Sequence, residues 1–464
     1  MITTLTPPAR IGRAAVGALG LLAAATGTLE SVVTPTLPLL QRELSMSPAE
    51  GALLSITMLI TGALVTPVAG NLGDRYGGKR VMLRLMAVVS AGGLVSALAP
   101  NLPVLLLGQV LEGAMVGAMP LSFILVRKHL PAGASAVAIG VVSGLFVGGG
   151  MLGTLLAGPI AEGLSRHWMF AIPTIAIVVA TLLVHWLMPA DPPAGSTAGM
   201  DWPGLFLLSG VLLTLMAGLS VAPDAGRQPL VLAALVLLLA LFIAGLAFVE
   251  RRSPAPMLDL RLLAEPALWS SYVITFAVCV GTSVATYLVP QLFAVAGDGY
   301  GFGASATDIG RYLLPSAVAA AISGPLGGFA ARRFGSSAVV ATGIGVMTAM
   351  LVALAVLHTD VWHLVVAKAL IALASGVCIT AMVVKTATAV DHGNTGIATS
   401  LVLVTRVIGF AVGVQISGAI LTAGTRPGMQ NPAESAFVTG LVVAGAVTAL
   451  SLLVVRTMSK GVEQ

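Results

Sequence analysis

The stretch PLVLAALVLLLALFIAGLAFV, residues 229–249, decides the class of fold, because no charged side chain interrupts it. About 20 apolar residues in a helix are enough to cross the roughly 30 Å hydrocarbon core of a bilayer. A membrane β-barrel would instead show strands of about ten residues with alternating hydrophobicity, and this run does not alternate. The stretch therefore predicts a transmembrane helix.

The rest of the chain has the same character. Of its 464 residues, 57% are hydrophobic and only 9% are charged, and the mean hydropathy is +1.01. These values are typical of proteins embedded in membranes and not of soluble ones. The predicted spans number about fourteen and lie near 14–38, 50–72, 81–99, 103–126, 136–160, 168–188, 202–221, 229–249, 268–294, 307–330, 337–357, 362–384, 396–422 and 437–456. We therefore expect an all-α integral membrane protein.

The distribution of Lys and Arg predicts the orientation, since short loops rich in these residues stay in the cytoplasm. Most of the 23 fall at the termini and in alternate loops. Those expected on the other side are Arg42, Arg166, Arg227, Arg311 and Arg426. The pattern predicts a multi-pass protein of a cell inner (plasma) membrane with both termini in the cytoplasm. The net charge of +5 then reflects topology and does not indicate nucleic-acid binding.

Two long connectors divide the chain. The Pro- and Gly-rich connector 188–204 and the charged connector 250–269 lie on either side of a pair of spans. They predict a six-helix bundle over 1–190, a two-helix insertion over 191–267 and a second six-helix bundle over 268–464. A weak repeat supports this division, because TPVAGNLGDRYGGKRVML (66–83) is echoed by SGPLGGFAARRFGSSAVV (323–340). Internal repeats are typical of secondary transporters, whose two halves move about a central site.

The segment GNLGDRYGGKR, residues 70–80, concentrates glycines and charges at the end of the second span. Glycines allow close approach of neighbouring helices, and the basic residues hold the segment at the cytoplasmic face. We interpret it as a conformational latch formed by Gly70, Asp74, Arg75, Gly77, Lys79 and Arg80. The alternative is an ordinary positive loop whose only role is in topology.

Four ionisable residues lie within predicted spans, namely Glu30, Glu112, Lys368 and Arg406. Such groups are costly in the hydrocarbon region and usually functional. Burial favours the neutral form of a carboxyl, so Glu30 and Glu112 are candidates for proton coupling. The alternative for all four is a set of structural ion pairs between the halves.

The candidate substrate cavity combines polar and cationic residues from both halves. Gln109 lies three residues before Glu112 and so shares its helix face. Tyr287 and Gln291 flank the helix-bending Pro290, with interfacial anchoring as the alternative. The full set is Gln109, Tyr287, Gln291, Arg406 and Lys368.

Enzyme functions find no support in the sequence. It contains no Walker loop, no HExxH and no GxSxG. Its two cysteines, Cys279 and Cys378, lie in apolar runs and suggest neither a disulfide framework nor a metal site. We expect no enzyme activity, cofactor, metal or nucleic acid, and a monomer whose partners are a small-molecule substrate, protons and the lipid bilayer.

Residues 70–80 resemble the loop signature of the major facilitator superfamily, in which Gly, three residues, Asp-Arg, one residue and Gly precede basic residues. The whole chain is similar to the fourteen-helix drug:proton antiporter branch. TLESVVTPTLPLLQREL (28–44) resembles its first-helix motif, with Glu30 in place of the more usual Asp. SRHWMFAIP (165–173) and TRVIGFAVGVQISG (405–418) are similar to its sixth- and thirteenth-helix motifs. The resemblance implies two six-helix bundles with two extra helices between them.

Two departures from that branch bear on mechanism. LLLGQVLEGAMVGA (105–118) has Gln109 where the branch usually carries a proton-transfer arginine, and GMLGTLLAGPIAEG (150–163) keeps only part of the antiporter motif. The function that we expect is proton-coupled export of small amphipathic compounds, as in drug or metabolite efflux, by alternating access. A lipid-handling facilitator and a non-transporting ligand sensor remain as alternatives.

Overall fold

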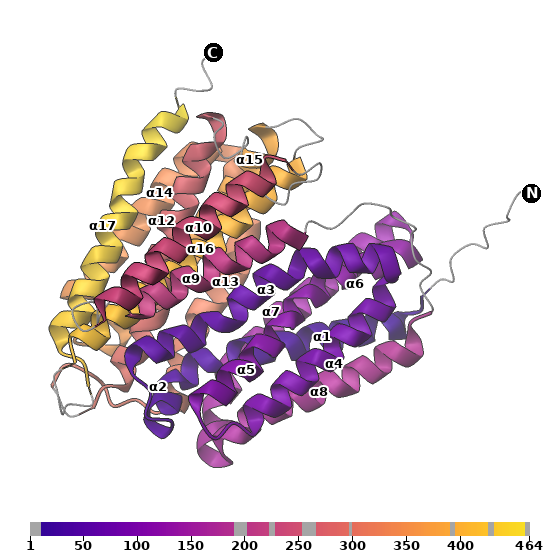
Figure 1. Ribbon diagram of the computed structural model, residues 1–464, viewed down its shortest axis with the longest axis horizontal. Coiled ribbons are helices and arrows are strands. Elements are labelled where there is room, and N and C mark those ends of the chain that lie inside the picture. The colour runs from indigo at the N-terminus through magenta and orange to yellow at the C-terminus, as the bar shows by residue number, and fades with distance from the viewer. Residues whose placement is uncertain are drawn as a thin grey trace, which may run out of the picture. The chain divides into compact units, whose positions relative to one another are not determined.

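The computed structural model describes residues 11–189, 202–221, 228–252, 266–296, 299–389, 395–425 and 431–459, and every regular element in them is a helix (Figure 1). The elements are α1 (Arg13–Ser31), α2 (Val33–Glu43), α3 (Pro48–Tyr76), α4 (Gly78–Ala97), α5 (Leu102–Glu112), η1 (Gly113–Gly117), α6 (Ala118–His129), α7 (Ala132–Gly163), α8 (Arg166–Leu187), α9 (Trp202–Val221), α10 (Pro229–Glu250), α12 (Pro266–Ala294), α13 (Ala306–Phe334), α14 (Ser336–Val356), α15 (Val361–Ala389), α16 (Thr395–Ala423) and α17 (Glu434–Ser459).

These helices confirm the predicted class of fold. Within the described residues, 13 helical segments are long and apolar enough to cross a membrane, and α9 contributes a shorter apolar segment, Trp202–Leu215. Each of the predicted spans corresponds to one helix or to one interrupted helix. Hydrophobic run length is a sound guide here because lipid forces the backbone to satisfy its own hydrogen bonds.

Two of the predicted spans are interrupted. The first breaks at Val32, between α1 and α2. Pro35 lies in the first turn of α2, where its ring would clash with the carbonyl of Ser31 in a continuous helix. The fourth span changes to the tighter 3₁₀ form in η1, whose sequence GAMVG begins and ends with glycine. Mid-helix 3₁₀ stretches often mark hinges.

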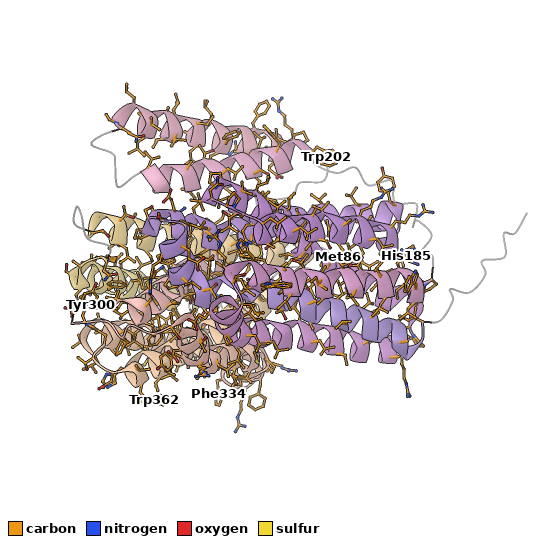
Figure 2. The ribbon with its side chains drawn as sticks, turned by 90° about the horizontal axis from the view of Figure 1, so that it is seen from below. Met86, His185, Trp202, Tyr300, Phe334 and Trp362 are labelled. Atoms are coloured by element: carbon orange, nitrogen blue, oxygen red, sulfur yellow. The ribbon has the colours of Figure 1, made fainter. Side chains whose placement is uncertain are left out.

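The chain forms two compact units. Unit 1 comprises Met1–Val33 and Thr57–Met200, and unit 2 comprises Thr34–Ile56 and Asp201–Gln464. The two helices between the six-helix sets, α9 and α10, thus belong to unit 2, where α10 lies beside α9 and α9 contacts α16 (Figure 2). Of α10, only Leu246 and Glu250 are buried. This apolar helix therefore contributes surface rather than core.

Glycines allow close contact between helices in each unit. In unit 1, a Cβ atom at Gly27 of α1 would lie 2.1 Å from the carbonyl oxygen of Phe146 in α7, and one at Gly149 of α7 would lie 2.0 Å from that of Ala24. In unit 2, a Cβ atom at Gly413 of α16 would lie 2.7 Å from the carbonyl oxygen of Val280 in α12. Each six-helix set thus has a glycine seam between its first and fifth spans, where an added Cβ atom would overlap backbone atoms of the facing helix.

The repeat seen in the sequence is also a repeat of backbone geometry. Between α3 and α4 the connection is Gly77 alone, with φ of 93° and ψ of 128°. Between α13 and α14 it is Gly335 alone, with φ of 82° and ψ of 143°. An exposed aromatic residue precedes each glycine, Tyr76 in unit 1 and Phe334 in unit 2. Both turns need glycine because L side chains rarely adopt positive φ.

The turn at Gly77 differs from the loop expected over residues 70–80. Helix α3 continues to Tyr76 and α4 begins at Gly78, so Gly77 is the one residue between them. A single glycine at positive φ reverses the chain without a loop. The basic residues that follow lie in the first turn of α4.

Candidate functional site

Glu112 is the most deeply buried acid of the candidate set and lies at the break in the fourth span. It is the last residue of α5, directly before η1, and is 0% exposed. Gln109 Nε2 donates a 2.6 Å hydrogen bond to Glu112 Oε2. The two side chains therefore share one helix face and one buried space, as their spacing predicted.

The space around Glu112 is narrow and weakly polar. In α4, a Cβ atom at Gly92 would lie 2.8 Å from the backbone nitrogen of Glu112. Ser96, one turn further along α4, neighbours the carboxyl. Neither Ser96 Oγ nor Glu112 Oε1 forms a hydrogen bond of good geometry, although both atoms are buried. The carboxyl thus has one well-formed hydrogen bond and one buried oxygen that has none.

Glu30, the other acid proposed for proton coupling, is half-buried at the end of α1, one residue before the helix ends at Ser31. The preceding turn is fixed to α7, because Thr28 Oγ1 lies 3.0 Å from the carbonyl oxygen of Gly149. Glu30 therefore sits where the α1–α7 seam meets the break at Val32. This position differs from the enclosed one of Glu112.

Lys368 lies inside unit 2. It is the eighth residue of α15, within the candidate span Val361–Thr386, and is 6% exposed. Its Nζ donates a 2.6 Å hydrogen bond to Thr286 Oγ1 of α12. Arg406, by contrast, is exposed on α16. The two cations of the candidate set thus have different surroundings.

Tyr287 and Gln291 join a polar network that sequence reasoning did not expect. Gln291 Nε2 donates to Gln41 Oε1 of α2 at 2.5 Å, and Gln41 Nε2 lies 3.3 Å from the hydroxyl oxygen of Tyr287. The Tyr287 hydroxyl itself donates to the carbonyl of Pro48 at the start of α3. Within unit 2 these contacts fasten residues 34–56 to α12.

A glycine makes room for this network. A Cβ atom at Gly51 would lie 2.0 Å from Gln41 Nε2 and 3.1 Å from the Tyr287 hydroxyl. Arg42 adds a hydrogen bond from Nη2 to the carbonyl of Ala294, 3.1 Å away. The environment of Tyr287 and Gln291 is therefore a junction of helix ends in which polar groups are already paired.

In the 70–80 segment, Lys79 Nζ donates a 2.5 Å hydrogen bond to the carbonyl of Met188, just after α8. This contact satisfies a free carbonyl at the carboxyl end of α8 and places a cation at its negative pole. Arg80 is exposed. The backbone of α3 passes through Gly70, Asp74 and Arg75, whose side chains lie outside the described ones.

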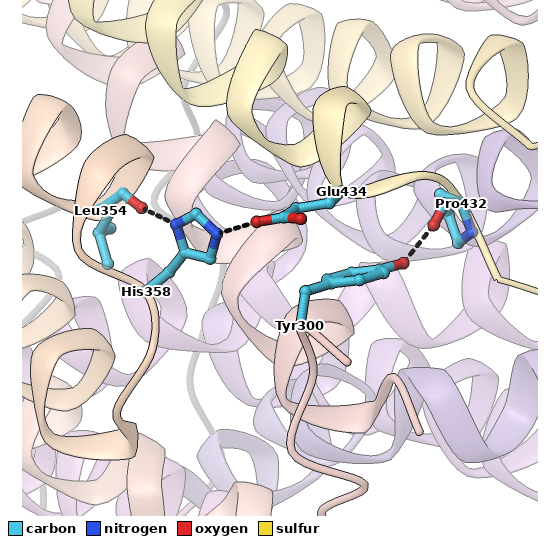
Figure 3. Close-up of polar contacts among 5 residues, drawn as sticks. All are labelled: Tyr300, Leu354, His358, Pro432 and Glu434. Atoms are coloured by element: carbon cyan, nitrogen blue, oxygen red, sulfur yellow. Dashed lines mark hydrogen bonds and ion pairs between the residues drawn. The ribbon is translucent and has the colours of Figure 1, made fainter. Parts of the chain in front are cut away.

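Sequence reasoning missed three side-chain partners of the candidate residues. Ser96, Gln41 and Thr286 are uncharged and lie in runs where nothing in the spacing distinguishes them. It also missed a contact outside the predicted spans that involves none of the candidate residues: His358 Nε2 lies 2.8 Å from Glu434 Oε1, and His358 Nδ1 lies 3.1 Å from the carbonyl of Leu354 (Figure 3). In the same loop region of unit 2, the Tyr300 hydroxyl donates a hydrogen bond to the carbonyl of Pro432 (Figure 3).

In the described part of the chain, His, Cys, Asp and Glu do not gather in groups of three or more that could hold a metal ion.

Comparisons with known proteins agree with this architecture. The model of the Major Facilitator Superfamily matches residues 19–316. A uridine/deoxyuridine transporter of Lactococcus lactis subsp. cremoris is 28% identical over 353 residues, which are 74% of this chain and 72% of that protein. A putative multidrug resistance protein, MdtD, of Salmonella paratyphi A is 27% identical over 61% of this chain and 59% of its own length.

Solved structures show the same fold at low sequence identity. The nucleoside transporter NupG superposes with a TM-score of 0.68 at 11% identity, over 96% of this chain and 99% of that one. A bacterial homologue of the lysosomal transporter Spinster gives a TM-score of 0.67 at 17% identity, over 96% and 97% of the two chains. Because the family model spans more than half of the sequence and the helical fold is shared, the chain belongs to the major facilitator superfamily.

Proposed function

We propose that this protein is a proton-coupled secondary transporter that exports small amphipathic compounds by alternating access. Membership of the major facilitator superfamily supports transport, and relatives with multidrug resistance names support efflux. The uridine/deoxyuridine transporter among its relatives adds nucleosides to the candidate solutes. The proposed setting is an inner membrane, with both termini in the cytoplasm and the protein as a monomer.

The observation on which proton coupling rests is the environment of Glu112. An isolated carboxylate in an apolar interior is strongly disfavoured unless its oxygens are hydrogen-bonded or paired with a cation. Glu112 has one donor, Gln109, and a second buried oxygen without a well-formed hydrogen bond. In this state we expect the carboxyl to be protonated, with Ser96 available to accept its hydrogen.

A change of conformation that admits water to Glu112 would stabilise the carboxylate and release the proton. The 3₁₀ turn η1 follows Glu112 directly, which provides a hinge at the point where such a change would act. Glu30 is proposed as a second proton site, since it too lies beside a helix break. For the 70–80 segment, the single-residue turn at Gly77 supports the proposed role of a latch.

Proton flux in proteoliposomes tests the proposal. Purified protein is challenged with cationic, neutral, anionic and lipid-like compounds, and lumenal pH is followed for wild type, Glu30→Gln and Glu112→Gln. We expect Glu112→Gln to reduce solute-driven proton flux by about 100-fold or more, because an amide cannot carry the proton. The matched control is Glu162→Gln in α7, which makes the same change at an exposed position of the same unit.

Two results would reject the proposal. If Glu112→Gln and Glu30→Gln both keep wild-type proton flux, neither acid couples transport. If no compound moves protons while lipid or dye redistributes equally in all variants, the lipid-handling alternative is favoured. A ligand sensor would instead bind a compound with no counter-flow of any kind.

A further inference from the structure

Lys368 is a buried cation whose compensation is incomplete. It lies in the interior of a predicted span and is 6% exposed. A charged side chain at such a position is costly and normally pairs with an opposite charge or several hydrogen bonds. Among the described residues, none of the carboxylates forms a salt bridge with Lys368, and its hydrogen bond goes to Thr286.

The hydrogen bond to Thr286 orients the ammonium group without saturating it. The Thr286 hydroxyl accepts from Lys368 Nζ at 2.6 Å and donates its own hydrogen to the carbonyl of Thr282 at 2.8 Å. The hydroxyl hydrogen is therefore committed, and the oxygen serves as an acceptor for Lys368. An ammonium group has three N–H donors, so two remain available for oxygen atoms of another molecule.

The surroundings of Lys368 are partly open. Thr282 and Thr286, one turn apart on α12, are both half-buried. Ala372, one turn after Lys368 on α15, is half-buried as well. These neighbours of Lys368 are therefore not fully enclosed, and two of them carry hydroxyl groups.

We propose that Lys368 binds a carboxylate or carbonyl oxygen of the transported solute, with Thr286 as the residue that positions its ammonium group. This inference rests on the proposed transport function and narrows its substrate class to neutral or anionic solutes that present hydrogen-bond acceptors. A permanent cation would meet a like charge in a medium of low polarity, where repulsion is weakly screened. Lys368 therefore selects against cationic drugs.

Equilibrium binding to the detergent-purified protein tests this assignment. The probes are uridine, a neutral carbonyl compound; salicylate, a carboxylate; and tetraphenylphosphonium, a cation without an acceptor. We expect uridine or salicylate to bind wild type, and Lys368→Met to weaken that binding about tenfold or more, as for a lost hydrogen bond to a charged group. Lys368→Arg should retain part of the affinity, and Thr286→Val should lose more of it than Thr286→Ser.

Two controls separate binding from folding. Lys385→Met removes a charge from the same helix α15 and should bind the probes as wild type does. The melting temperature of Lys368→Met without ligand should equal or exceed that of wild type, because replacement of a buried charge by an apolar side chain relieves desolvation. A purely structural role for Lys368 would instead lower the melting temperature and leave the affinity of the folded fraction unchanged.

The outcomes for this inference and for proton coupling are separable. Wild-type affinity in Lys368→Met, binding of tetraphenylphosphonium alone, or binding of no probe would each overturn the assignment of Lys368. Lys368-dependent binding in a protein that moves no protons would support the assignment and reject only the coupling. Solute-driven proton flux in a protein whose solute binding does not depend on Lys368 would support proton coupling and reject the assignment of Lys368.

Discussion

The fourth span of each six-helix set carries a buried ionisable side chain, yet the two spans are built differently. In unit 1, Glu112 ends α5 and the chain passes into the 3₁₀ turn η1. In unit 2, Lys368 lies in α15, which is continuous over Val361–Ala389. The acid is thus placed at a local break and the base on an uninterrupted helix. A break suits a group that changes its environment, and a rigid helix suits a group that holds a ligand in place.

The largest effect on stability is expected at the glycine seams. A Cβ atom at Gly149 would overlap the backbone carbonyl of Ala24, at 2.0 Å. At Gly413 its nearest neighbour is the side-chain oxygen of Ser283, at 2.1 Å, and the nearest backbone oxygen, that of Val280, lies farther away, at 2.7 Å. A side chain can rotate away and a backbone cannot. We expect Gly149→Ala to cost about 3 kcal/mol and Gly413→Ala about 1–2 kcal/mol, measured by thermal unfolding in detergent.

The control for this comparison lies one residue away. A Cβ atom at Gly148 meets nothing within 4 Å, so Gly148→Ala should be neutral or slightly stabilising because alanine favours helix. Adding Ser283→Ala to Gly413→Ala should recover part of the loss in unit 2. Equal losses at Gly148 and Gly149 would show that the α1–α7 seam is looser than its geometry indicates.

A smaller loss of stability, of similar size in both units, is expected at the two single-residue turns. Gly77→Ala and Gly335→Ala each place an L side chain at positive φ, in a sparsely populated backbone region that costs about 1–3 kcal/mol. We expect the two variants to lose similar stability in thermal unfolding, and Gly77→Ala to lose more proton flux. This result would identify the turn in unit 1 as a latch and the turn in unit 2 as purely structural. Gly345→Ala, where a Cβ atom meets nothing within 4 Å, is the control. Equal losses of flux would remove the functional difference between the turns.

The smallest effect is expected where loops join helix ends. In unit 1, Arg166 Nη2 donates to the carbonyl of Ala99 at 3.2 Å, a side-chain contact with backbone. In unit 2, His358 instead contacts Glu434, whose side chain is 51% exposed. Exposed pairs contribute little, so Glu434→Gln should lower the unfolding free energy by less than about 1 kcal/mol.

Asp360→Asn serves as the control for this pair, since Asp360 is 74% exposed and lies 4.0 Å from His363. It should have no measurable effect on thermal unfolding. A loss of several kcal/mol from Glu434→Gln would mean that the contact between His358 and Glu434 stabilises unit 2 far more than an exposed pair does (Figure 3).

Much of the fold could be predicted because lipid imposes a simple rule on sequence. The run 202–221 coincides with α9, and 229–249 lies within one residue of α10 at its carboxyl end. The repeat between 66–83 and 323–340 was visible in the sequence, and the structure adds that Gly77 and Gly335 form equivalent turns within it. Span breaks were harder to predict, because the hydrophobicity of GAMVG does not reveal whether its backbone is α or 3₁₀.

The candidate site was only partly predictable. Glu112 and Lys368 stand out in any apolar run because charge is rare there. Their partners were not equally predictable. Gln109 lies three residues from Glu112, so the spacing indicates the pair, whereas Thr286 is 82 residues from Lys368 on another helix. The environment of Tyr287 was also beyond sequence reasoning, because Gln41 and Pro48 reach it from the opposite end of the chain.

The sequence by itself determined that this protein is a bundle of membrane helices with a repeated glycine-rich helix end and a few charges inside apolar runs. Hydrophobic run length and the cost of a buried charge act locally along the chain, so both can be read from the sequence. Only the tertiary structure decided that Glu112 is enclosed against α4, that Lys368 is bound to Thr286, and that Tyr287 and Gln291 are paired with α2 and the start of α3. These pairings depend on which helix faces meet, and helix packing joins residues far apart in sequence through shape rather than through any local pattern.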